Sequence, residues 1–127
     1  MIVDAHTHLV DRDWLPERWW NALAEIYVHE LARMGTSVSK EDVKRVIFPQ
    51  FYDPDARKLI AEMDKAGIDV SIVFTVDFGL ALGEPKIPIE EQNRIITKLQ
   101  DKYPDRIVAL FTIDPRRPNA VELFEMA

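Results

Sequence analysis

Two histidines placed two residues apart, His6 and His8, are the side chains of this chain best suited to chemistry. They lie in an apolar opening segment, residues 2–9, whose pattern predicts a β-strand. Successive side chains of a strand point to opposite faces, so His6 and His8 share one face, with Cα atoms roughly 6 to 7 Å apart. Two imidazoles in this arrangement can bind one divalent cation at about 2.0 to 2.1 Å. The spacing therefore predicts a metal site in which His6 and His8 are ligands.

Asp4 precedes this pair by two residues and is expected on the same face. Its carboxylate could accept a hydrogen bond from a ligand histidine and orient that ring, or it could form hydrogen bonds only within the sheet. A His-x-His pattern is short, and an ordinary pair of strand histidines is the alternative interpretation. Two features favour the metal: the pair includes two of the chain's 3 histidines, and a polar, aromatic-rich segment follows the strand.

The composition is that of a single globular domain. The 127 residues are 47% hydrophobic and 30% charged, with a formal net charge of -6, which argues against disorder. Nucleic acid is not an expected partner, because phosphate binding needs clustered Lys and Arg and the pair Arg116-Arg117 is too small a cluster.

The chain contains no cysteine, which excludes disulfides, thiolate zinc sites and a cysteine nucleophile. Any metal must therefore be held by nitrogen and oxygen ligands. No apolar run approaches the ~20 residues that cross a bilayer, and the amino terminus lacks a basic region followed by a hydrophobic stretch. We expect a cytoplasmic protein with no membrane partner.

The order of predicted elements is strand, helical insert, helix, strand, helix, strand. The insert spans residues 13–48, and Ser39 with Asp42 resembles the cap of a second short helix within it. Asp53 is expected to cap the next helix, which Gly67 ends. Further elements are predicted at residues 69–76 (strand), 88–103 (helix), 107–113 (strand) and after Asn119 (a short helix). This alternation is typical of βαβ units, which place sites at the carboxyl ends of parallel strands.

Other side chains near these strand ends are weaker candidates. Trp14 and Arg18, in the insert, and Asp77, after the second strand, could contact a substrate. The alternatives are packing for Trp14, a solvated charge for Arg18 and a turn or cap for Asp77. Asp114 is similarly expected to cap or turn the chain, and His29 to lie on a helix surface. No single residue is identified as catalytic.

The segment Ile2-Val3-Asp4-Ala5-His6-Thr7-His8-Leu9 resembles the amidohydrolase superfamily. The long insert, the segment 66–73 and the strand 106–111 with Asp114-Pro115 narrow the resemblance to the amidohydrolase-related branch, which includes aminocarboxymuconate semialdehyde decarboxylase and γ-resorcylate decarboxylase. The resemblance covers essentially the whole chain, but only the His-x-His element is specific to the chemistry.

The resemblance implies a (β/α)8 TIM-type barrel with a divalent metal, most often zinc, at its carboxyl rim, and His6 and His8 as ligands from the first strand. A whole barrel needs ~250 residues, so residues 1–127 are expected to form a single partial domain of about three βα units. The implied function is metal-dependent hydrolysis or non-oxidative decarboxylation of a small carboxylated substrate, aromatic substrates included. Activity of these residues alone is doubtful.

Two other functions remain open at this point. Metal-dependent phosphoesterases and nucleases of related barrel families also begin with Asp-x-His-x-His. In those families a second strand or a Ser-Asp-Gly sequence is expected soon after the histidines, whereas this chain continues into Val10-Asp11-Arg12 and a long insert. A non-catalytic interaction module that retains only the scaffold is the other alternative. Because three parallel strands cannot close into a barrel, we expect the isolated chain to self-associate, to need a second chain that carries the missing strands, or to fold poorly alone.

Overall fold

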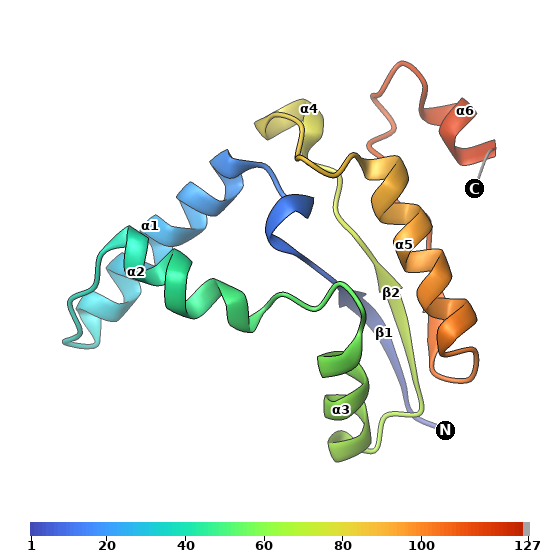
Figure 1. Cartoon of the computed structure of the whole chain (residues 1–127), viewed down its shortest axis with the longest axis horizontal. Coiled ribbons are helices and arrows are strands. Elements are labelled where there is room, and N and C mark those ends of the chain that lie inside the picture. Colours follow the sequence, from blue (N-terminus) through green and yellow to red (C-terminus); the bar gives the residue numbers. More distant parts are fainter. Residues whose placement is uncertain (126–127) are drawn as a thin grey trace.

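The computed structural model describes residues 1–125 as a mixed α/β protein with a small sheet (Figure 1). The three strands are parallel and adjacent in the order β1 (Val3–His8), β2 (Val70–Phe74) and β3 (Ile107–Ala109). This alternation of parallel strands with helices agrees with the prediction. The strands are shorter than their predicted ranges, most clearly β3, which ends at Ala109 instead of residue 113.

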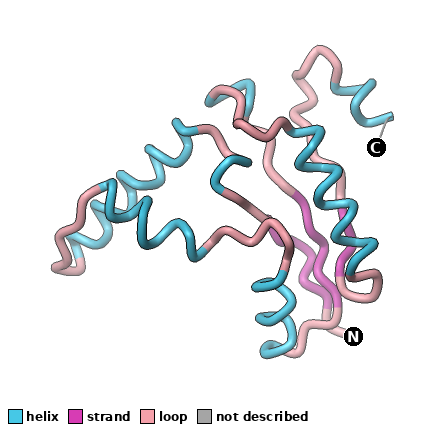
Figure 2. Tube along the Cα trace, viewed as in Figure 1, coloured by secondary structure: helices cyan, strands magenta, loops and turns pink. Residues whose placement is uncertain are grey.

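Helices occupy the connections between the strands and the segment after β3, as Figure 2 shows. They are α1 (Glu17–Arg33), α2 (Lys40–Asp42), α3 (Arg57–Ala66), α4 (Gly79–Leu82), α5 (Ile89–Lys102) and α6 (Ala120–Glu125). The short helix α4 lies between the predicted strand 69–76 and the predicted helix 88–103, where the sequence predicted no element. Among residues 1–125, no helix has the length and apolar character required to cross a membrane.

One face of the sheet is covered by α3 and α5, which flank the strands in Figure 1. Apolar side chains from both helices pack there against alternate residues of the strands, as amphipathic helices do on a parallel sheet. The buried members of this core are Leu9, Trp14, Ala56, Val73, Ile96, Leu99 and Ile107. The core therefore lies entirely on this side of the strands.

The opposite face of the sheet remains largely exposed. Val3, Val108 and Leu110 retain 47%, 40% and 47% of their accessible surface. Ile72 is the register partner of Val108 and is only half-buried. An apolar sheet face of this kind is uncommon on a monomeric soluble protein.

Strand β1 contains a bulge that reverses its faces. Asp4 pairs with Ser71 and Thr7 with Val73, so three steps along β1 match two steps along β2. One extra residue in a strand shifts its alternation. Asp4 consequently lies on the helix-covered face with Thr7, whereas His8 lies on the exposed face. The prediction that Asp4 shares a face with the histidines is wrong, because it assumed uninterrupted alternation.

The helical insert folds around a second apolar cluster. It begins with a 3₁₀ turn at Arg12–Trp14 and, after α1 and α2, continues through a π-helical turn (Val43–Ile47) and a 3₁₀ turn (Phe48–Gln50). The predicted cap of Ser39 and Asp42 is present at the start of α2, where the two residues form a capping box. The buried side chains are Leu15, Trp20, Ala24, Val43 and Phe48.

Helix α3 begins later than the sequence suggested. Ala56 has a left-handed φ of 59° and occupies the cap position, so the helix starts at Arg57. Asp53 still satisfies helix amides, because its carboxylate accepts hydrogen bonds from the backbone N–H groups of Lys58 (3.0 Å) and Leu59 (2.8 Å). Asp53 is thus a capping residue that acts across an intervening turn and not as the N-cap itself.

Candidate metal-binding site

The imidazoles of His6 and His8 converge at the carboxyl end of β1. Their Nε2 atoms are 3.0 Å apart, and the ring centroids are separated by 4.7 Å with an interplanar angle of 87°. Both side chains belong to exposed residues. The convergence expected from their spacing is therefore present in the fold, and the bulge turns both rings away from the helices.

The electrostatics favour an uncharged imidazole at His8. Partial burial lowers its pKa from the usual 6.5, and the neighbouring His6 adds to this effect, although the backbone of Phe74 and Thr75 acts in the opposite direction. A neutral ring nitrogen is the form that binds a metal ion. His8 is consequently more available as a ligand near neutral pH than an ordinary exposed histidine.

The pair fits one divalent ion. With metal–nitrogen bonds of about 2.0 to 2.1 Å, two nitrogens 3.0 Å apart subtend an angle of about 91 to 97° at the ion. Within the part of the chain that the structure describes, no group of three or more His, Cys, Asp or Glu residues could hold a metal. The two histidines therefore provide an incomplete ligand set.

Asp4 does not contact either imidazole through a hydrogen bond shown by the structure. Its carboxylate accepts hydrogen bonds from the Thr7 hydroxyl (2.7 Å) and from the backbone N–H of His6 (3.2 Å). These two donors lower the pKa of Asp4, the Thr7 hydroxyl most. Asp4 thus stabilises the bulged backbone that carries the histidines, which agrees with the alternative expectation of hydrogen bonds within the sheet and not with the orientation of a ligand ring.

Trp14 is a core residue in this structure. It is 2% exposed and packs with Leu9 and Ile96 in the cluster beneath the sheet, while its carbonyl accepts a hydrogen bond from Gln92 (2.8 Å). This burial removes Trp14 from the set of predicted substrate contacts. Arg18 is exposed on the first turn of α1, and its proposed contact with a substrate carboxylate stays a prediction.

Asp77 forms a buried ion pair. Both of its oxygens accept hydrogen bonds at 2.6 Å from Arg117, one from Nε and one from Nη2, and the backbone N–H groups of Gly79 and Asp114 also donate to them. Four donors leave this carboxylate little capacity for a ligand, so the predicted substrate contact at Asp77 is not supported. Its role is to join the loop after β2 to the segment before α6.

Arg117 is the residue of this pair that sequence reasoning missed. It lies 40 residues from Asp77 and also binds Glu84 through Nη1 (2.8 Å). Its pKa is raised, mainly by the hydrogen bonds to Asp77 and Glu84. No local pattern in the sequence links Arg117 with Asp77, because only the return of the chain after β3 brings them together.

Two residues that the sequence made weaker candidates have local roles. Asp114 binds Arg116 with Oδ2 2.6 Å from Nη2, and hydrogen bonds from Arg116 lower its pKa from 3.8 to about 2. This agrees with the expected cap or turn. His29 lies exposed on α1, as expected for a surface residue.

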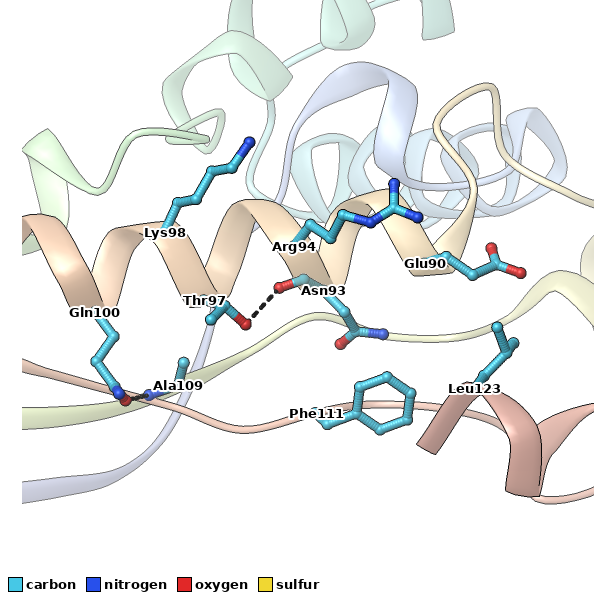
Figure 3. A pocket seen from close by; sticks show the side chains of 9 residues that line it. All are labelled: Glu90, Asn93, Arg94, Thr97, Lys98, Gln100, Ala109, Phe111 and Leu123. Carbon is cyan, nitrogen blue, oxygen red and sulfur yellow. Dashed lines mark hydrogen bonds between the residues drawn. The ribbon is translucent and has the colours of Figure 1, made fainter. Parts of the chain in front are cut away.

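A cavity of about 480 Å³ lies on the helix side of the molecule (Figure 3). Within it, Gln100 of α5 accepts a hydrogen bond from the backbone N–H of Ala109 (2.8 Å), at the edge of β3 that does not face β2. Phe111 and Leu123 close its apolar side. Neither His6 nor His8 lines this cavity, so we do not place the site there.

The fold and the site together define an α/β protein with a histidine pair at the carboxyl end of a parallel strand. No family model and no curated protein matches the chain. A solved structure to which it is similar is 5-carboxyvanillate decarboxylase from Novosphingobium aromaticivorans, in complex with manganese and 4-hydroxy-3-methoxy-5-nitrobenzoic acid. The identity is 20% and the TM-score 0.47, over 94% of this chain. The chain spans 35% of the length of that solved structure.

Proposed function

We propose that this chain is part of a metal-dependent enzyme in which His6 and His8 bind one divalent ion. The observation that carries the proposal is the 3.0 Å separation of their Nε2 atoms at the carboxyl end of β1. Imidazoles that face each other in this way match the ligand geometry of one ion. Because the chain itself offers an incomplete ligand set, the remaining ligands would come from water or from other strands.

We further propose that the three βα units belong to a (β/α)8 barrel, with residues 1–127 as one partial domain. Barrel enzymes place their active sites at the carboxyl ends of the strands, which is where the histidine pair lies. The exposed face of the sheet would then line the barrel interior. This assignment accounts for the exposure of apolar residues such as Val108 and Leu110 on that face among the described residues.

The proposed reaction is non-oxidative decarboxylation, or hydrolysis of a C–C bond, in a small carboxylated substrate. In decarboxylation the ion would bind and orient the substrate carboxylate through its positive charge. In hydrolysis it would lower the pKa of a bound water molecule. Ile72 and Phe74 form an apolar surface beside the histidines that suits a hydrocarbon or aromatic part of the substrate. Zinc is the first candidate, and an angle of about 91 to 97° also suits an octahedral ion such as manganese.

The test is calorimetric titration of the full chain with Zn²⁺ and with Mn²⁺. We expect one ion per chain, bound far more weakly than at a four-ligand zinc site because half of the shell is solvent. The double variant His6→Ala/His8→Ala should lose this binding. His29→Ala, the matched control, should retain it because His29 lies on α1.

Unchanged binding in the double variant, or no binding by the unmodified chain, would contradict the proposed metal site. The substrate class has its own test, in which a nitro-substituted hydroxybenzoate is added to the metal-loaded chain. We expect a shift of its visible absorption band that the double variant does not produce. Absence of this shift while an aryl phosphodiester is cleaved would favour a phosphoesterase instead.

A further inference from the structure

The aromatic ring of Phe74 contacts both histidines of the pair. Its centroid lies 4.8 Å from that of His6 and 4.4 Å from that of His8, with interplanar angles of 83° and 73°. The two imidazoles are themselves 4.7 Å apart at 87°. The three rings therefore form a closed cluster in which each ring meets the other two edge to face.

This cluster is anchored by the sheet. Phe74 is the register partner of His8 and ends the central strand β2, which is hydrogen-bonded to β1 on one side and β3 on the other. Phe74 is half-buried, whereas both histidines are exposed. The more buried ring thus lies against the two more exposed ones.

Exposed histidines on a strand ordinarily sample several χ1 rotamers and a broad range of χ2. A metal ion accepts two of them only when both Nε2 atoms point to one place. Edge-to-face contact with a fixed ring favours a subset of those rotamers. The rotamers present here are ones in which the Nε2 atoms face each other at 3.0 Å.

We propose that Phe74 is a positioning residue for the metal site, holding the imidazoles of His6 and His8 in the orientation that binds one ion. This inference rests on the proposed function, since it concerns the same ion. Phe74 acts through ring geometry and does not itself bind the ion. A residue that only filled apolar space on the exposed face would be replaceable by any side chain of similar volume.

The test compares Phe74→Leu, which keeps apolar volume but removes the ring, with Phe74→Tyr, which keeps the ring. Co²⁺ serves as the probe, because its visible absorption reports the ligand geometry. We expect roughly tenfold weaker Co²⁺ affinity and an altered spectrum for Phe74→Leu, as for residues that orient metal-binding histidines. Phe74→Tyr should stay close to the unmodified chain. Val108→Ala, a truncation of an exposed residue on the same face in β3, is the matched control and should leave affinity and spectrum unchanged.

A second readout needs no metal. In the proton NMR spectrum, the imidazole C–H protons of His6 and His8 should show a nuclear Overhauser effect with each other, because the two ring centroids lie 4.7 Å apart. We expect this cross-peak to weaken in Phe74→Leu but not in Phe74→Tyr. If Phe74→Leu fails to fold by circular dichroism, Phe74→Met provides the same comparison.

The outcomes separate the two proposals. Equal Co²⁺ affinity and spectrum in Phe74→Leu and the unmodified chain would overturn the positioning role while leaving the metal site intact. Failure of the unmodified chain to bind Co²⁺, Zn²⁺ or Mn²⁺ would instead overturn the proposed function. In that case the NMR comparison still decides whether Phe74 orders the two rings.

Discussion

At the scale of residues, the carboxyl ends of the strands carry two different polar arrangements. His6 and His8 are exposed and converge on each other, whereas Asp77 is saturated by four donors and its side chain is 3% exposed. A carboxylate buried with a guanidinium keeps its charge only while that partner remains. We therefore assign binding to the histidine pair and structural integrity to Asp77 with Arg117.

Replacement of the Asp77 carboxylate should destabilise the fold. Asp77→Asn leaves Arg117 without its buried counter-charge, and we expect the free energy of unfolding at pH 7 to fall by about 3 kcal/mol. Urea denaturation measures this change. Glu84→Gln is the control, because Glu84 binds the same guanidinium but is 56% exposed, and it should cost less than about 1 kcal/mol.

The same variant should change the dependence of stability on pH. Burial raises the pKa of Asp77, but the hydrogen bonds from Arg117, Asp114 and Gly79 outweigh burial and hold that pKa below 3.8. As the pH falls, the Asp77 carboxyl is therefore protonated in the unfolded chain before it is protonated in the folded chain. The contribution of Asp77 to stability is fully present above about pH 4 and declines below it. Asp77→Asn should show a flatter decline, and an unchanged slope would contradict this account.

At the scale of elements, the start of α3 shows how a distant carboxylate can cap a helix. The left-handed backbone at Ala56 separates Asp53 from the helix, yet the carboxylate still accepts the amides of Lys58 and Leu59. These are N–H groups that the helix itself cannot satisfy. Since α3 covers part of the core, its first turn matters for the packing beneath the strands.

Loss of this capping carboxylate should cost more than loss of a surface carboxylate on the same helix. We expect Asp53→Ala to lower the free energy of unfolding by about 1 to 2 kcal/mol. Glu62→Ala removes an exposed pair with Lys65 and should cost less than about 0.5 kcal/mol. Chemical denaturation of both variants tests this, and equal losses would show that the Asp53 bonds contribute nothing specific.

At the scale of the whole molecule, the exposed sheet face is the feature that most needs a partner. The outer edges of the sheet are partly protected, because Gln100 binds Ala109 at β3 and the carbonyl of Val10 accepts the N–H of Asp53 beyond β1. The face itself has no such protection at Val3, Val108 and Leu110. We therefore expect association through the face and not through the edges.

This expectation can be measured by size-exclusion chromatography with light scattering. The unmodified chain should self-associate, and the double variant Val108→Ser/Leu110→Ser should shift the distribution toward monomer by removing apolar contact area. The control Ile26→Ser/Val121→Ser removes two exposed apolar side chains from α1 and α6 and should not produce this shift. A monodisperse monomer of the unmodified chain would contradict the expected association.

Much of the architecture could be predicted because it depends on neighbours along the chain. The order of strands and helices follows from apolar periodicity and capping residues, and the capping box of Ser39 and Asp42 joins residues three apart. The convergence of His6 and His8 is equally local, since two residues of one strand share a face. Helix boundaries were less predictable, because the turn at Ala56 delays α3 despite a suitable cap at Asp53.

The sequence by itself determined the element order and the pairing of His6 with His8, because both arise from separations of a few residues. Only the tertiary structure decided which face Asp4 occupies, because a bulge relative to β2 reverses the alternation. It also decided the burial of Trp14 and the pairing of Asp77 with Arg117 across 40 residues. Both features depend on how segments that are distant in the sequence pack together. A local sequence pattern cannot predict such contacts, because the side chains meet only after the chain has folded.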